Sequence, residues 1–125
     1  MDQIVQQHSY FKREEFACGC GCGFDELDPG LWDILNVTRE RTGRVMFINS
    51  GCRCSAHNLA VGGSPTSSHL YGLAVDIRCD NDEHRWQLIL VLMSLGVTRI
   101  GIAKGFIHID IDRKKTPFRI WVYKT

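Results

Sequence analysis

Two short segments of the chain carry polar side chains that could bind a metal ion on otherwise apolar strands. Near the C-terminus, three isoleucines alternate with His108, Asp110 and Asp112. Because successive side chains of a strand point to opposite faces, the isoleucines share a core face and the polar residues share the other. The segment 73–77 alternates in the same way, with Asp76 opposite its larger apolar residues. Each strand taken singly also fits a solvated face, so a third group decides between these interpretations.

That third group is the imidazole of His69, which lies just before the segment containing Asp76. Gly72 permits a sharp bend between them, which lets His69 fold back toward Asp76. Two imidazoles and one carboxylate, from His69, Asp76 and His108, form a common catalytic zinc set that leaves the fourth tetrahedral position open for water. Zinc lowers the pKa of that water and polarises a carbonyl, so these residues predict hydrolysis near neutral pH.

The spacing of these residues resembles a known peptidase family. The pattern Ser-x-His-x-x-Gly-x-Ala-x-Asp runs from Ser67 to Asp76 and is followed by a late histidine on a strand. It is similar to the zinc D-Ala-D-Ala carboxypeptidases, a family that includes vancomycin-resistance D,D-dipeptidases and phage L-alanyl-D-glutamate endolysins and shares its fold with the hedgehog signalling domain. The likeness is greatest to a short phage and prophage branch. It also covers Phe11 to Cys22, Ile48 to Arg53, His57-Asn58, Val61 to Gly63, Phe106 to Asp110 and Trp121.

The resemblance implies roles for five residues. His69, Asp76 and His108 would bind zinc. Arg53 stands where such enzymes have an arginine near the scissile carbonyl, and a cation there would stabilise the oxyanion; the alternative is a surface salt bridge. Ser67 would help to hold the substrate or the metal site, or would cap its loop.

The identity of the general base stays open. Better-known members often have an acid three residues before the final histidine, and this chain has Gly105 there. Asp110 shares a face with His108 and is the expected substitute, able to take a proton from water and pass it to the leaving amine. Alternatively, Asp110 orients a histidine ligand, and Asp112 is a weaker candidate base. Asp110→Asn separates these roles.

The remaining histidines and the six cysteines are assigned more loosely. We expect His57 to line the cleft, and His84 and His8 to lie on an exposed helix start and in a polar tail. The cysteines are Cys18, Cys20, Cys22, Cys52, Cys54 and Cys79. In a reducing compartment they are expected to be thiols or metal ligands rather than disulfides. Their alternate spacing is not the CxxC of a zinc ribbon, so a structural zinc cluster and buried reduced thiols both remain open.

The elements that must position these groups form one α+β domain over residues 1–125, with helices packed on a mainly antiparallel sheet, as the resemblance also implies. Expected helices run from Pro29, capped by Asp28, to Gly43; from Ser55 to near Gly62; and from a cap at Asp80 or Asn81 to Gly96. The third helix would face the core with Trp86, Ile89, Leu90 and Met93. Expected strands cover 45–49, 73–78, 99–102, 106–112 and 118–123. Tight connections favour antiparallel pairing of the late strands.

Composition excludes several functions. The 125 residues hold 15 basic and 14 acidic side chains, a net charge of +1 that gives no bias toward nucleic acid or an anionic membrane. The longest apolar stretch, 88–93, is too short to span a bilayer. Met1–His8 has neither the basic start nor the apolar run of a signal peptide, so we expect synthesis in the cytoplasm. A monomer is the default.

The function expected from these observations is a zinc metallopeptidase that hydrolyses stem peptides of bacterial peptidoglycan. Three bonds remain possible: that of a D-Ala-D-Ala carboxypeptidase, an L-Ala-D-Glu endopeptidase or a crosslink-cutting D,D-endopeptidase. A phage or prophage endolysin that reaches the cell wall through a holin pore fits the absent signal peptide. The alternative is a zinc-containing, non-catalytic module that binds peptidoglycan or a protein, and Gly105 keeps it open.

Overall fold

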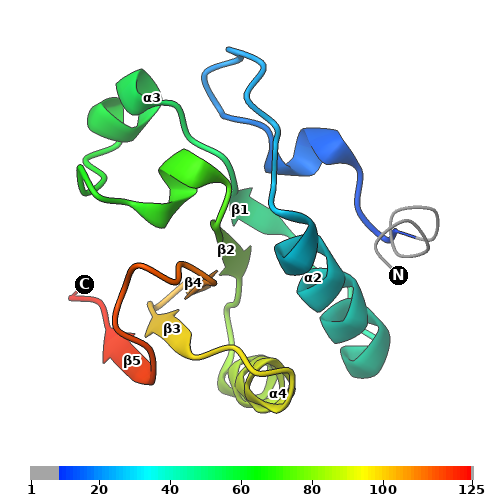
Figure 1. Ribbon diagram of the computed structural model, residues 1–125. Helices are drawn as coiled ribbons and strands as arrows, with labels where there is room; N and C mark the ends of the chain where they lie inside the picture. Colours follow the sequence, from blue (N-terminus) through cyan, green and yellow to red (C-terminus); the bar gives the residue numbers. More distant parts are fainter. Residues whose placement is uncertain (1–8, 125) are drawn as a thin grey trace.

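The structure is a computed structural model that describes residues 9–124, so the expectations for Met1–His8 concern residues outside the described part. Two 3₁₀ helices (η), three α-helices and five strands are present in this part (Figure 1). In chain order they are η1 (Arg13–Phe16), α2 (Pro29–Thr42), β1 (Ile48–Ser50), α3 (Ser55–Ala60), η2 (Ser68–Tyr71), β2 (Ala74–Arg78), α4 (Asp82–Ser94), β3 (Arg99–Ile102), β4 (Phe106–Asp110) and β5 (Arg119–Val122).

The five strands form one sheet in the order β1-β2-β4-β3-β5. All neighbours are antiparallel except β5, which runs parallel to β3. The expected α+β class with a mainly antiparallel sheet is confirmed, but antiparallel pairing of all the late strands is wrong. The end of β4 lies beside the start of β3, because these two strands are antiparallel. The chain then crosses to the other edge of β3 and begins β5 beside the start of β3, so β5 runs parallel to it.

One face of the sheet is the hydrophobic core. Figure 1 shows α2 and α4 on this side of the sheet, and α3 and η2 on the other. The fully buried side chains here are Leu31, Leu35, Val75, Ile77, Leu88, Leu92, Ile107 and Ile109. Each contributes about 1.5–3 kcal/mol of transfer free energy. The alternation read in β2 and β4 is therefore confirmed, and it leaves Asp76, His108 and Asp110 on the face opposite α2 and α4.

The helix α2 has the expected ends. The Asp28 side chain accepts a hydrogen bond from the Gly30 N–H at 2.8 Å, which satisfies one of the free donors of the first turn. Gly43 ends the helix in the left-handed region, at φ 65°. In α4, Asn81 is the cap, because its side chain accepts from the His84 N–H at 2.8 Å.

The expected core face of α4 is wrong. Trp86, Leu90 and Met93 are more than half exposed, whereas Leu88 and Leu92 are fully buried and Ile89 is partly buried. The run from Trp86 to Met93 is apolar on almost every side of the helix, so its spacing alone does not select a face. The packing against α2 selects the stripe through Leu88 and Leu92.

Strand boundaries differ where pairing stops. The first strand begins at Ile48 rather than Val45, because its partners in β2 start at the pair Ile48↔Ile77, and Val45 and Phe47 are exposed. The strand β4 ends at Asp110, where its pairing with Ala74 ends. Within residues 9–124, no helix combines the length and apolar character needed to cross a membrane.

Candidate metal centre

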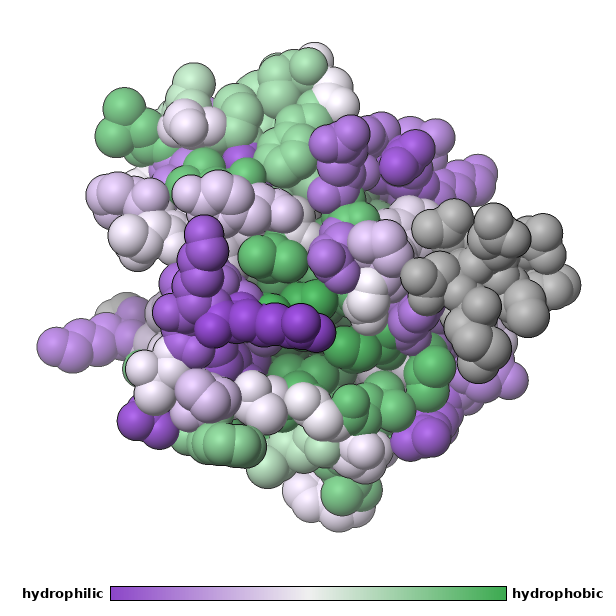
Figure 2. Space-filling view, in the orientation of Figure 1, coloured by the Kyte–Doolittle hydropathy of each residue, from purple (hydrophilic) through white to green (hydrophobic). Residues whose placement is uncertain are grey.

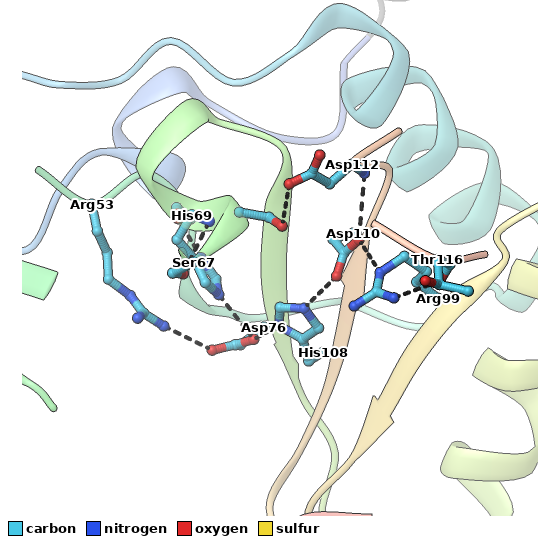
Figure 3. A network of polar contacts seen from close by, with 11 residues as sticks. Arg53, Ser67, His69, Asp76, Arg99, His108, Asp110, Asp112 and Thr116 are labelled. Atoms are coloured by element: carbon cyan, nitrogen blue, oxygen red, sulfur yellow. Dashed lines mark hydrogen bonds and ion pairs between the residues drawn. The ribbon is translucent and has the colours of Figure 1, made fainter. Parts of the chain in front are cut away.

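His69, Asp76 and His108 converge on one point of the sheet face opposite α2 and α4. Asp76 and His108 are cross-strand neighbours in β2 and β4. The Asp76 Oδ1 atom lies 2.9 Å from His108 Nδ1 and 3.3 Å from His69 Nε2. One ligand atom from each of the three residues lies within 4.8 Å of the others, and all three residues are buried. Figure 3 shows Arg53, His69 and His108 gathered around Asp76.

The position of His69 depends on the short helix η2 and its ends. Ser67 caps η2, because its Oγ accepts from the His69 N–H at 3.2 Å. Gly72 ends it at φ 68°, where a Cβ atom would lie 2.1 Å from the Glu26 carbonyl oxygen, so only glycine fits. The bend expected at Gly72 is confirmed, and it returns the chain to β2 with His69 facing Asp76.

The His69 ring has one nitrogen in use and one without a hydrogen-bond partner. Its Nδ1 lies 2.6 Å from the Gly51 carbonyl oxygen, which can only accept, so Nδ1 donates. In the neutral imidazole, Nε2 then carries a lone pair. This atom is buried, makes no hydrogen bond to the residues described, and faces the Asp76 carboxylate. A cation bound between His69 Nε2 and the Asp76 carboxylate would satisfy both of these electron-rich groups.

The surroundings keep Asp76 ionised. Burial alone would raise its pKa, but the hydrogen bond from His108 and the charge of that imidazole outweigh burial and hold the pKa of Asp76 well below its usual range. The pKa of His108 is raised: burial lowers it, but the carboxylates of Asp110 and Asp76 outweigh burial. A carboxylate that stays charged at neutral pH is in the form that binds a metal.

Asp110 contacts the other nitrogen of His108. Its Oδ2 lies 3.0 Å from His108 Nε2, and its Oδ1 accepts from Arg99 Nε at 2.8 Å. Burial would raise the pKa of Asp110, but His108 and Arg99 hold it below its usual value. Arg99 in turn donates to the Thr116 carbonyl at 2.7 Å and lies over the Trp121 ring. Both carboxylate oxygens of Asp110 are thus engaged, and the side chain is 1% exposed.

Arg53 is held at the edge of the same site. Its Nε donates to Ser50 Oγ at 3.1 Å and one terminal nitrogen to Asn58 Oδ1 at 3.0 Å. The other terminal nitrogen lies 3.6 Å from Asp76 Oδ2. Only 13% of the side chain is exposed, so this is not a surface salt bridge. Gly63 leaves room for this arrangement, because a Cβ there would lie 2.1 Å from Asn58 Oδ1.

These groups line an open cleft of about 530 Å³. His57 lines it as expected, and so do Ser67 and Lys115. His84 does not, because it lies in α4. Asp112 is occupied elsewhere, since its carboxylate accepts from Ser68 Oγ at 2.9 Å and from the Lys114 N–H at 3.0 Å.

Sequence reasoning did not assign Arg99 and Tyr123 to this cleft. Trp121 and Tyr123 share one face of β5 and its continuation, and both line the cleft beside His108. Gly101, paired with His108 and Trp121, makes room for both aromatic rings, because a Cβ there would lie 2.7 Å from each. The alternation of aromatic residues in 119–123 was a signal for this face, whereas nothing in the sequence pairs Arg99 with Asp110.

Comparison with known proteins identifies a family. A family model described as Peptidase M15 matches residues 9–110, a range that includes His69, Asp76 and His108 as well as Arg53 and Asp110. A search of curated proteins gives no significant match.

Proposed function

We propose that this chain, which belongs to the peptidase M15 family, is a zinc peptidase that hydrolyses stem peptides of bacterial peptidoglycan. Membership supports a metal-dependent peptidase and confirms the expected family. The observation that carries the proposal is the convergence of His69, Asp76 and His108, with a buried lone pair at His69 Nε2 facing a charged carboxylate. Two imidazoles and one carboxylate are a zinc donor set with room for a reactant.

Zinc, when bound there, would supply Lewis acidity that activates water and polarises the scissile carbonyl. The Arg53 guanidinium, fixed by Ser50 and Asn58, would donate to the oxygen of that carbonyl as negative charge develops on it. Because its donors are fixed before the substrate binds, little reorganisation accompanies the reaction. Ser67 would act mainly through His69, whose backbone it caps.

Of the two roles left open for Asp110, we propose that of orienting His108. Its oxygens already bind Arg99 and the ring nitrogen of His108 that faces away from Asp76. Such a contact fixes the ring and its tautomer, so that Nδ1 is directed at the metal. A carboxylate with both oxygens engaged and 1% exposure is poorly placed to exchange protons with a substrate.

The cleft suits a short peptide that carries carboxylates. Arg53 and Lys115 add positive charge to its lining, and Trp121 and Tyr123 add flat apolar surfaces. Stem peptides combine free carboxylates with small apolar side chains, which matches both features. All three candidate bonds place a carboxylate near the scissile bond, so the fragment masses must identify the bond. A monomeric phage or prophage endolysin is the biological setting that we propose, on the resemblance to that branch.

The test is incubation of the zinc-loaded protein with purified cell-wall sacculi, followed by mass analysis of soluble and residual muropeptides. The proposal predicts new fragments that identify the cut bond, and none with His108→Ala. A protein that sediments with sacculi and binds zinc, yet releases no fragment from any wall type, would be the non-catalytic module instead.

A further inference from the structure

Four cysteine thiols lie together at a second place, on the loop between η1 and α2 and at the start of α3. Cys18, Cys20 and Cys22 belong to the loop, and Cys54 caps α3. Their sulfur atoms all lie within 4.8 Å of one another. Figure 1 shows the loop beside α3, and in Figure 2 these two segments form the mostly hydrophobic top of the molecule. Residues 36 apart in sequence, Cys18 and Cys54, thus meet in space.

The separations match a tetrahedral metal site. The Sγ atoms of Cys18 and Cys20 lie 3.4 Å apart, those of Cys20 and Cys54 3.6 Å, and those of Cys18 and Cys54 3.8 Å. Four sulfurs at about 2.3 Å from a zinc ion lie about 3.8 Å from one another in a regular tetrahedron. A disulfide requires about 2.05 Å between its sulfurs, and none of these pairs approaches that value.

The exposure of the thiols argues against a packing role. Cys20 and Cys22 are exposed, whereas unbound cysteines are among the most buried residue types. The two cysteines outside the cluster follow that rule, because Cys52 and Cys79 are each 1% exposed. Within the cluster Cys18 is buried and Cys54 is partly buried, so it is the exposure of Cys20 and Cys22 that packing does not explain.

The backbone of the loop is shaped around the sulfurs. Gly21 and Gly23 take positive φ angles, 81° and 93°, which fold the loop tightly. The Cys18 N–H donates to the Phe24 carbonyl at 2.8 Å and closes the loop. Two sulfurs accept backbone hydrogen bonds at 3.4 Å, Cys18 from the Cys54 N–H and Cys54 from the His57 N–H. Donors directed at sulfur stabilise thiolate ligands.

We propose that Cys18, Cys20, Cys22 and Cys54 bind a structural zinc ion, distinct from the proposed catalytic one. Each thiol releases its proton to solvent as its sulfur coordinates the metal, so four protons balance the four new bonds. Structural zinc sites of this kind use all four positions for protein ligands and leave none for water.

Such a site would restrict the motion of a segment that lines the catalytic cleft. Cys54 follows Arg53 directly, and the Gly51 carbonyl holds His69 Nδ1. The helix that Cys54 caps carries Asn58, which binds the Arg53 guanidinium. A metal that ties Cys54 to the N-terminal loop would therefore fix the segment 51–58 that positions Arg53. The proposal concerns metal binding and does not depend on the peptidase activity.

Metal counting on matched variants tests it. Purified with zinc, the wild-type chain should hold two ions, and Cys22→Ser one. His108→Ala should also hold one, because it removes the other site, and the control Cys79→Ala should keep two. Cobalt in place of zinc should give sulfur-to-cobalt charge-transfer absorption in wild type and His108→Ala, weakened in Cys22→Ser. A wild-type chain that holds one ion and shows no such absorption would refute the structural site and leave the catalytic site standing.

A measurement on the wild-type chain needs no variant to fold. Alkylation in the native state should spare all four cluster thiols while zinc is bound, and a chelator should expose Cys20 and Cys22 to the reagent. Cys52 and Cys79 are each 1% exposed, so these two thiols should stay unmodified in both states. Rapid alkylation of Cys20 and Cys22 in the zinc-loaded protein, or a disulfide between cluster cysteines found by mass, would refute the site.

Discussion

Replacement of Asp110 by asparagine distinguishes the two roles open to this residue. The carboxylate accepts one hydrogen bond from Arg99 and one from His108. Asparagine offers one oxygen and one NH₂ group, so one of these two donors must face another donor. A hydrogen bond to a charged group contributes about 1.5–3 kcal/mol. The loss of one, at about 2 kcal/mol, corresponds to roughly a 30-fold change in an equilibrium constant.

If Asp110 orients His108, the loss of this hydrogen bond weakens zinc binding. We expect Asp110→Asn to bind the catalytic zinc about 10–100-fold more weakly, the range found when the partner of a metal-bound histidine is removed. At saturating zinc, kcat should stay within a few-fold of wild type. The assay is zinc competition against a chromophoric chelator, followed by muropeptide release at a zinc concentration that fills the site.

Asp112→Asn is the matched control, because Asp112 binds Ser68 and Lys114 rather than the histidine. It should leave zinc affinity unchanged. A general base contributes about 10²–10⁴-fold to the rate. A fall of that size in kcat for Asp110→Asn at saturating zinc, with wild-type zinc affinity, would refute the orienting role and make Asp110 the base.

Three further predictions concern other parts of the molecule. Arg53→Ala should lower kcat/KM on the order of 100-fold without changing zinc content, because a fixed oxyanion donor is lost; unchanged kinetics would exclude that role. Gly101→Ala should destabilise the protein by about 1–3 kcal/mol in urea unfolding, since its Cβ would lie 2.7 Å from the rings of Trp121 and Tyr123. The control Gly105→Ala, with nothing within 4 Å of the added carbon, should do so far less. Burial raises the pKa of Cys52 from 9.0 in the unfolded chain to about 11 in the folded protein. Between these two values the unfolded chain loses the thiol proton more readily than the folded protein does, so the free energy of unfolding falls as pH rises from 9 toward 11. The metal-free wild-type protein should therefore lose roughly 2–3 kcal/mol more than Cys52→Ala over that interval, and equal losses would contradict the shift.

The sequence predicted the elements whose residue pattern depends on local structure. The caps at Asp28 and Gly43 and the alternation around Asp76 and His108 are properties of neighbouring residues, and all are present in the structure. The grouping of His69 with Asp76 also followed from a local feature, the bend at Gly72.

Features that depend on contacts between distant residues could not be predicted in the same way. The core face of α4 is chosen by packing against α2, because the helix is apolar on nearly every side. Arg99 and Asp110 meet only because β3 and β4 pair, and no spacing in the sequence marks them as partners. The sequence left a structural zinc cluster open, but only the fold shows that Cys54 joins the thiols of the N-terminal loop.

The proposed peptidase activity requires the metal that His69, Asp76 and His108 would hold. The most direct test is stem-peptide hydrolysis by metal-stripped protein before and after zinc is restored, with His69→Ala treated in parallel. We expect no product from the stripped protein, recovery of activity with zinc, and no recovery in the variant. Full activity after metal removal, or a His69→Ala protein that zinc restores to the wild-type rate, would contradict this expectation.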